Sequence, residues 1–238
     1  MPHGFQIGAG KLTDGHLAVS ETVKHAVIRH ASGSDLNALE IEREDLHQKI
    51  KAGKTGHLIL FVVDASGSMA AGKRMEAVKG SVLALLQDAY QKRDRVGVIS
   101  FRGVEAEVLL EPTRSIEFAE QAMETLPTGG RTPLAHALQI SLQLIQNQPN
   151  DIKPLLIILS DGKANVPLAG GGDPWQQALQ LAVTIGEMQI KSLVFDTESG
   201  YLRLGKAAEL ANALKGDYLP LEELTPQSIT TNIHSKIV

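Results

Sequence analysis

The chain has 238 residues, no cysteine and a formal net charge of −4, from 23 basic and 27 acidic side chains. The absence of cysteine excludes disulfides, thiolate metal sites and cysteine nucleophiles, and a slightly acidic chain without a long basic run gives no sign of nucleic-acid binding. Residues 1–20 contain no apolar signal-peptide core and no apolar run approaches membrane-spanning length, so we expect a cytoplasmic protein.

Residues 1–56 are predicted to form a polar amino-terminal extension. They contain a weakly alternating run over residues 17–28 and a charged stretch over residues 40–51, and are otherwise irregular. We therefore expect a lead-in segment that packs on the main domain.

From His57 onward, apolar runs of strand length alternate with segments of helical period. This order predicts one α/β domain over residues 57–238, built on a doubly wound, mostly parallel sheet. Gly103 lies in a short link between two apolar runs, which suits a hairpin, so one edge strand is expected to be antiparallel. Strands are predicted at residues 58–63, 95–101, 106–110, 155–160, 190–196 and near Tyr218, and helices at 73–91, 115–125, 133–147, 174–188, 202–214 and 226–236.

Three oxygen-bearing side chains, Asp64, Ser66 and Ser68, directly follow the first of these strands. A carboxylate and two hydroxyls at this spacing suit a small hard cation such as Mg²⁺ or Mn²⁺. Because hydroxyls are neutral ligands, the cation would still seek an anionic oxygen from outside. The alternative is an ordinary turn, since these residue types also favour turns and helix N-caps.

Two later segments favour the metal site over the turn. Thr132, before Pro133, is predicted to be the N-cap of a helix whose first residue is Pro133, and Asp161 directly follows the strand at 155–160. Loops at the carboxyl ends of neighbouring strands converge in an open α/β sheet. We therefore predict one site for Mg²⁺ or Mn²⁺, with the ligands Asp64, Ser66, Ser68, Thr132 and Asp161.

Residues 63–69, 130–134 and 160–162 together resemble the von Willebrand factor A (integrin I) domain and its metal-ion-dependent adhesion site. Residues 61–69, 74–80, 95–103, 106–110, 133–138 and 161–166 resemble, more narrowly, the carboxyl-terminal part of the magnesium chelatase D subunit. The AAA+ half and the acidic, proline-rich linker of that family have no counterpart among these 238 residues.

The resemblance implies a Rossmann-like fold and a non-catalytic domain that binds an acidic residue of a partner through the metal. The implied partners are an AAA+ ATPase subunit and a large porphyrin-binding subunit, which inserts Mg²⁺ into protoporphyrin IX in tetrapyrrole biosynthesis. A cobaltochelatase subunit and an independent adhesion or interaction module are the alternatives.

Four further side chains are predicted to form a partner-binding rim around the metal. Lys73, Arg74 and Arg131 flank the site and are expected to pair with acidic groups of the partner through charge-assisted hydrogen bonds. His136 follows Thr132 on the predicted helix and joins this rim. The alternative is that all four are ordinary solvated or core residues. No residue is expected to be catalytic, because Ser66 and Ser68 have no local base.

Overall fold

The computed structural model describes residues 5–12, 16–31, 40–52, 56–66, 69–92, 94–123, 129–149, 151–198, 204–220 and 225–237. The chain divides into two compact units, Met1–Lys54 and Thr55–Val238. This division lies close to the boundary expected after residue 56. The expected packing of the first segment on the main domain remains a prediction.

The first unit contains regular structure where an irregular extension was expected. Strands β1 (Phe5–Lys11) and β2 (His47–Ala52) pair antiparallel, and between them in sequence come helix α1 (Val19–Ala31) and the short 3-10 helix η1 (Arg43–Asp45). The helix was missed because its buried positions carry small side chains with little hydrophobic signal. These positions, four residues apart, are Thr22 and Ala26, and Ala18 directly before the helix is buried as well.

The second unit is built on a six-stranded sheet in the order β5-β4-β3-β6-β7-β8. Neighbouring strands run parallel except at one edge, where β5 runs antiparallel to β4. The predicted mostly parallel sheet with one antiparallel edge strand is therefore confirmed. The strands are β3 (His57–Asp64), β4 (Arg95–Arg102), β5 (Glu105–Thr113), β6 (Lys153–Ser160), β7 (Lys191–Asp196) and β8 (Asp217–Pro220).

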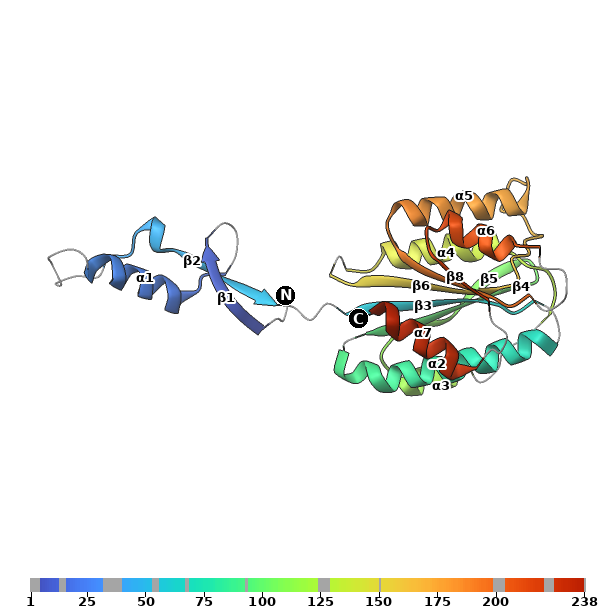
Figure 1. The fold of residues 1–238 in the computed structure, drawn as a ribbon, viewed down its shortest axis with the longest axis horizontal. Helices are drawn as coiled ribbons and strands as arrows, with labels where there is room; N and C mark the ends of the chain where they lie inside the picture. The colour runs from blue at the N-terminus through green and yellow to red at the C-terminus, as the bar shows by residue number, and fades with distance from the viewer. Residues whose placement is uncertain are drawn as a thin grey trace. The chain divides into compact units, whose positions relative to one another are not determined.

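Helices cover both faces of this sheet (Figure 1). The central strand β3 is buried on both sides, with Leu60 among the side chains that face one helix layer and Phe61 among those that face the other. Burial on two faces explains why β3 is a continuous apolar run. One layer consists of α4 (Leu134–Gln146), α5 (Pro174–Glu187) and α6 (Lys206–Ala213), and the other of α2 (Met69–Lys92), α3 (Ile116–Ala122) and α7 (Pro226–Ile237).

Helix α4 begins one residue later than expected. Its N-cap is Pro133, with ψ of 59°, and its first helical residue is Leu134. The prediction that Thr132 caps this helix was therefore wrong. The reason is that the Thr132 backbone is bonded on both sides to Asn165, through its N–H and its carbonyl oxygen, and stays outside the helix. The other predicted elements of this unit have ends within four residues of those observed.

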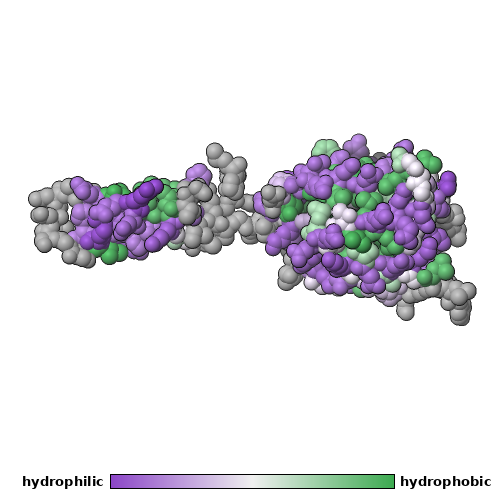
Figure 2. Space-filling model, turned by 90° about the horizontal axis from the view of Figure 1, so that it is seen from above, coloured by the Kyte–Doolittle hydropathy of each residue, from purple (hydrophilic) through white to green (hydrophobic). Residues whose placement is uncertain are grey.

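The face formed by α4, α5 and α6 is mainly hydrophilic, with apolar side chains scattered in small areas (Figure 2). These helices turn their apolar sides toward the sheet, where residues such as Leu138, Ala178 and Leu210 are fully buried. Among the helices described, none combines the length and the apolar character that crossing a bilayer would need.

Gly162 fixes the loop that follows β6. Its φ of +75° lies in the left-handed region, and a Cβ atom placed on it would lie 2.6 Å from the backbone nitrogen of Ala207 in α6. Both the backbone conformation and the close approach require glycine. The backbone conformation of the loop that carries Asp161 is therefore constrained at Gly162 by the close contact with α6.

Replacing Gly162 with alanine should lower the free energy of unfolding by about 2–5 kcal/mol, because left-handed strain and steric overlap add. Urea-induced unfolding of the full chain measures this loss. The matched control is Gly205→Ala, because Gly205 has a similar φ of +69° with no heavy atom within 4 Å of the added Cβ. The control should lose only about 1–2 kcal/mol. Equal losses in the two variants would show that the approach to Ala207 has no energetic weight.

Candidate metal centre

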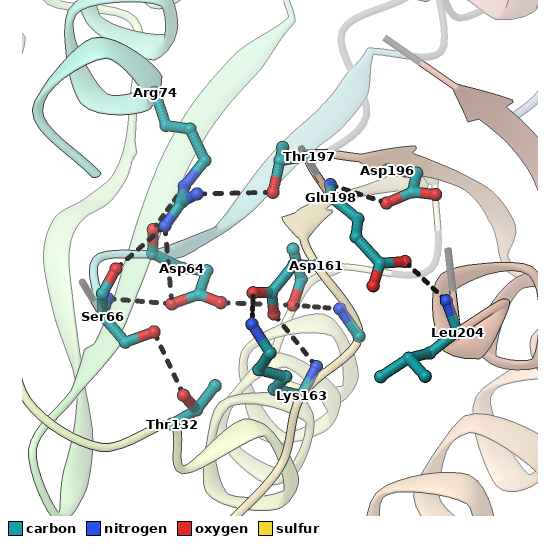
Figure 3. Close-up of polar contacts among 12 residues, drawn as sticks. Asp64, Ser66, Arg74, Thr132, Asp161, Lys163, Asp196, Thr197, Glu198 and Leu204 are labelled. Carbon is teal, nitrogen blue, oxygen red and sulfur yellow. Dashed lines mark hydrogen bonds and ion pairs between the residues drawn. The ribbon is translucent and has the colours of Figure 1, made fainter. Parts of the chain in front are cut away.

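Side chains from three loops converge at the carboxyl end of the central strands (Figure 3). Asp64 ends β3, Asp161 follows β6, and Thr132 precedes α4. The Thr132 hydroxyl donates a hydrogen bond to Ser66 Oγ over 3.0 Å, which joins the loop after β3 to the loop before α4. Four of the five ligands predicted from the sequence therefore lie at one edge of the sheet. The fifth, Ser68, lies outside the described residues.

Asp64 is a fully buried carboxylate. Its Oδ1 accepts a hydrogen bond from the Ser66 backbone N–H over 2.8 Å, and its Oδ2 accepts one from Ser160 Oγ over 3.3 Å. Burial raises the pKa of the Asp64 carboxyl, and the negative charge of Asp161 adds to the rise. Hydrogen bonds from Ser66 and the charge of Arg74 oppose it. The charge of an ionised Asp64 is thus compensated only in part.

Arg74 holds the loop that carries Asp64 and Ser66. From helix α2, its guanidinium donates Nε–H to the Asp64 carbonyl over 3.0 Å and Nη2–H to the Ser66 carbonyl over 2.9 Å. A longer bond of 3.5 Å reaches Thr197 Oγ1 after β7. Arg74 is only 7% exposed. Arg74 was predicted to lie on an exposed partner-binding rim. In the structure it is buried instead, and its guanidinium donates hydrogen bonds to loops of its own chain.

Asp161 is bound at both carboxylate oxygens by one residue. The Lys163 backbone N–H donates to Oδ1 over 3.1 Å, and the Lys163 ammonium lies 2.8 Å from Oδ2. The hydrogen bond to Asp161 raises the pKa of Lys163, and the charges of Asp161, Glu198 and Asp64 act in the same direction against a smaller effect of burial. The ammonium is therefore in contact with Asp161 and is acted on by the charges of Glu198 and Asp64.

Thr132 is held in place by Asn165. The Asn165 side-chain oxygen accepts a hydrogen bond from the Thr132 N–H over 2.7 Å, and the Asn165 N–H donates to the Thr132 carbonyl over 3.1 Å. This two-way pairing resembles a short piece of strand ladder. It fixes the backbone of Thr132 and leaves the hydroxyl directed toward Ser66.

Two glycines bring the loop before α4 close to its neighbours. The Gly129 N–H donates to the Ala65 carbonyl over 2.8 Å. Gly130 has φ of +98°, and a Cβ atom on it would lie 3.1 Å from the backbone of Gly103, at the turn between β4 and β5. The loop that carries Thr132 is thus packed against both the Asp64 loop and the edge hairpin.

The other predicted rim residues differ in their surroundings. Lys73 and Arg131 are exposed, and Arg131 donates one hydrogen bond to the Asn165 carbonyl over 2.8 Å. His136 is half-buried, and its Nδ1 accepts a hydrogen bond from the Ala106 N–H over 3.0 Å. That bond connects α4 to β5 and leaves the proton of a neutral ring on Nε2. Lys73 and Arg131 therefore remain available to a partner, whereas His136 has a structural contact.

The donor atoms suit a hard divalent cation such as Mg²⁺ or Mn²⁺. Asp64, Asp161, Ser66 and Thr132 offer oxygen only, which these cations prefer. A cation would also complete the partial compensation of the buried Asp64 charge. Within the ranges that the structure describes, no three His, Cys, Asp or Glu side chains come together. A site here therefore depends on the two hydroxyls in addition to the two carboxylates.

Sequence reasoning did not identify the supporting roles of three residues, although it placed one of them, Arg74, on the rim. Ser160 donates to Asp64, Asn165 holds Thr132, and Arg74 binds the loop carbonyls instead of a partner. Ser160 could have been found, because it follows the apolar run of β6 just as Asp64 follows that of β3. No local pattern indicated the other two, because their partners lie on distant loops.

Comparison with known proteins identifies relatives of this chain. Residues 59–163 match the model of the von Willebrand factor type A domain. The chain is 37% identical over 240 aligned positions to the magnesium-chelatase 67 kDa subunit of Chlorobaculum parvum, covering 92% of this chain and 39% of that protein. It therefore spans well under half of the length of that relative.

A second relative is similar over nearly its whole length. An uncharacterized protein of Methanocaldococcus jannaschii is 39% identical over 166 residues, covering 68% of this chain and 94% of the relative. Among solved structures, the manganese-loaded TRAP protein of Plasmodium vivax aligns with a TM-score of 0.54 and 13% identity, covering 76% of this chain and 72% of the TRAP chain. At that identity the likeness concerns the fold alone.

Replacing Arg74 with methionine should lower the free energy of unfolding by about 2–4 kcal/mol, because two loop carbonyls lose their donors and Asp64 loses its nearest cation. Urea-induced unfolding measures the change. Lys73→Met is the matched control on the same helix, and an exposed site should change by less than about 0.5 kcal/mol. Unfolding of both variants at the same urea concentration would contradict the assigned role of Arg74.

Asp64→Asn should be at least as stable as the natural chain at pH 8 in EDTA. The raised pKa means that the folded state holds the Asp64 proton more tightly than the unfolded state, so this group's contribution to stability falls as pH rises from the unfolded toward the folded pKa. Asparagine removes that titration and still offers an oxygen to the Ser66 N–H. The stability difference between the two chains should shrink toward pH 4, as measured by thermal unfolding. A variant that is clearly less stable at pH 8 would show that burial is not the dominant effect.

Proposed function

This chain belongs to the von Willebrand factor type A domain family, and from its similarity to a magnesium-chelatase subunit we propose that it is a divalent-cation-dependent protein-interaction domain of a magnesium chelatase. The observation that carries the proposal is the fully buried Asp64 carboxylate, with its charge only partly compensated, beside the paired hydroxyls of Ser66 and Thr132.

The proposed ligands of Mg²⁺ or Mn²⁺ are those predicted from the sequence, namely Asp64, Ser66, Ser68, Thr132 and Asp161. When bound, the cation supplies an electrophilic position for a carboxylate of the partner, because neutral hydroxyl ligands leave it a net positive charge.

The surrounding residues prepare the site before a partner arrives. Arg74 and Asn165 fix the two loops that carry the hydroxyls, so little ordering is left to be done on binding. Lys73 and Arg131 are exposed and are proposed to pair with acidic groups around the bridging carboxylate.

The proposed partners are the AAA+ ATPase subunit and the large porphyrin-binding subunit of a cytoplasmic chelatase. The domain would couple ATP-driven movement of the first to the second, in the biosynthesis of a magnesium tetrapyrrole. Support comes from the 37% identity to the magnesium-chelatase subunit of Chlorobaculum parvum, which extends over 92% of this chain.

A second candidate function is an independent interaction module that works outside any chelatase. The observation that favours it is the Methanocaldococcus jannaschii relative, because this chain covers 94% of that protein. A protein of that size holds the domain and little else. The metal site would serve both functions in the same way, so the partner distinguishes them.

The test is a pull-down from a lysate of the source cells with the purified chain, in Mg²⁺ and in EDTA. We expect an AAA+ ATPase and a large porphyrin-binding protein to be recovered in Mg²⁺ and lost in EDTA, because chelation removes the bridging ion. The matched control is Asp64→Asn, which should recover neither protein in either buffer.

Three outcomes separate the proposals. Equal recovery in Mg²⁺ and EDTA contradicts the bridging role of the metal. Metal-dependent recovery of a different protein, with neither chelatase subunit, favours the independent module. A rise in the melting temperature of the natural chain with Mn²⁺, absent in Asp64→Asn, confirms cation binding independently of any partner.

A further inference from the structure

Lys163 binds the carboxylate of Asp161, which is a predicted metal ligand. Its ammonium lies 2.8 Å from Asp161 Oδ2, while its backbone N–H takes Oδ1 over 3.1 Å (Figure 3). Both oxygens of Asp161 are therefore engaged by one residue two positions further along the chain. A cation that approaches Asp161 Oδ2 meets a positive charge already bound there.

The position of the ammonium suits a tethered counterion. Besides Asp161, the carboxylates of Glu198 and Asp64 are close enough to act on its charge. Glu198 comes from the loop after β7, where its N–H is fixed by Asp196 Oδ1 over 2.8 Å and its own Oε2 accepts from the Leu204 N–H over 3.0 Å. Besides its contact with Asp161, this single lysine is thus acted on by the negative charges of two further carboxylates.

The Lys163 side chain is free to leave. It is 59% exposed, whereas the Asp161 side chain is 19% exposed, so the ammonium can return to water while the carboxylate stays at the site. An exposed ion pair of this kind is weak enough to be exchanged. A divalent cation, with twice the charge, can therefore displace it without any change in the fold.

We propose that Lys163 is an internal competitor for the metal, which neutralises Asp161 in the metal-free protein and sets the concentration of divalent cation at which the site fills. This inference rests on the proposed function of the same site. After displacement, the ammonium remains tethered two residues from the metal ligand.

The sign of the effect separates competition from a merely structural role. A lysine that only held Asp161 in position would weaken metal binding when removed. A competitor strengthens it, because the cation no longer has to displace the ammonium and no longer meets its repulsion. Loss of one exposed pair corresponds to about a two- to fivefold change in affinity.

The experiment is a titration of the full chain with Mn²⁺, following the free ion by electron paramagnetic resonance. Lys163→Met should bind Mn²⁺ about two- to fivefold more tightly than the natural chain. Lys163→Arg keeps the charge and should stay within about twofold of the natural affinity. Lys153→Met is the matched control for net charge, because Lys153 is an exposed lysine at the opposite end of strand β6.

A double-mutant cycle tests whether the effect passes through Asp161. In an Asp161→Asn background, Lys163→Met should change the affinity for Mn²⁺ by less than it does in the natural chain, because the ion pair that the cation displaces is already absent. If the natural chain binds Mn²⁺ and Lys163→Met binds it equally or more weakly, the proposed competition by Lys163 is wrong, while the proposed metal site stands. If neither chain shows saturable binding that Asp64→Asn abolishes, the proposed metal site falls as well.

Discussion

The burial of one negative charge governs the arrangement of this domain. Asp64 ends the central strand β3 and is removed from water, with donors at both of its carboxylate oxygens. A buried carboxylate needs such donors and a nearby positive charge to be tolerated. Helix α2 contributes Arg74, strand β6 contributes Ser160, and the following loop folds back through the Ser66 N–H. Most of the polar contacts at this edge of the sheet can be read as consequences of that requirement.

The fold was largely predictable because its signals are local. Continuous apolar runs predicted β3 and β6 as strands buried on both faces, and the order of strands and helices left few topologies open. The residues brought together at the site were also predictable, since Asp64 and Asp161 follow neighbouring parallel strands and must lie at the same edge. The start of α4 was missed by one residue, because the pairing of Thr132 with Asn165 overrides the usual preference of Thr-Pro for a helix start.

The rest depended on interactions between segments distant in sequence. Arginine is a residue type that usually lies on the surface. Only the fold shows that the guanidinium of Arg74 reaches the carbonyls of Asp64 and Ser66. His136 likewise meets the backbone of Ala106 on another element. In the first unit, the buried positions of α1 are Thr22 and Ala26, so hydrophobic periodicity could not reveal the helix. Side chains of ambiguous character take their role from their neighbours.

The contact between Gly130 and Gly103 bears on how this sequence can vary. The tip of an edge hairpin is ordinarily a place where insertions are tolerated, because it projects into solvent and touches little. Here the tip between β4 and β5 packs against the loop that carries Thr132. A Cβ atom on Gly130 of that loop would lie only 3.1 Å from the backbone of Gly103 at the tip. Lengthening that hairpin would move a hydroxyl of the proposed metal site. Natural variants of this domain should therefore keep the length of a loop that contributes no ligand of its own.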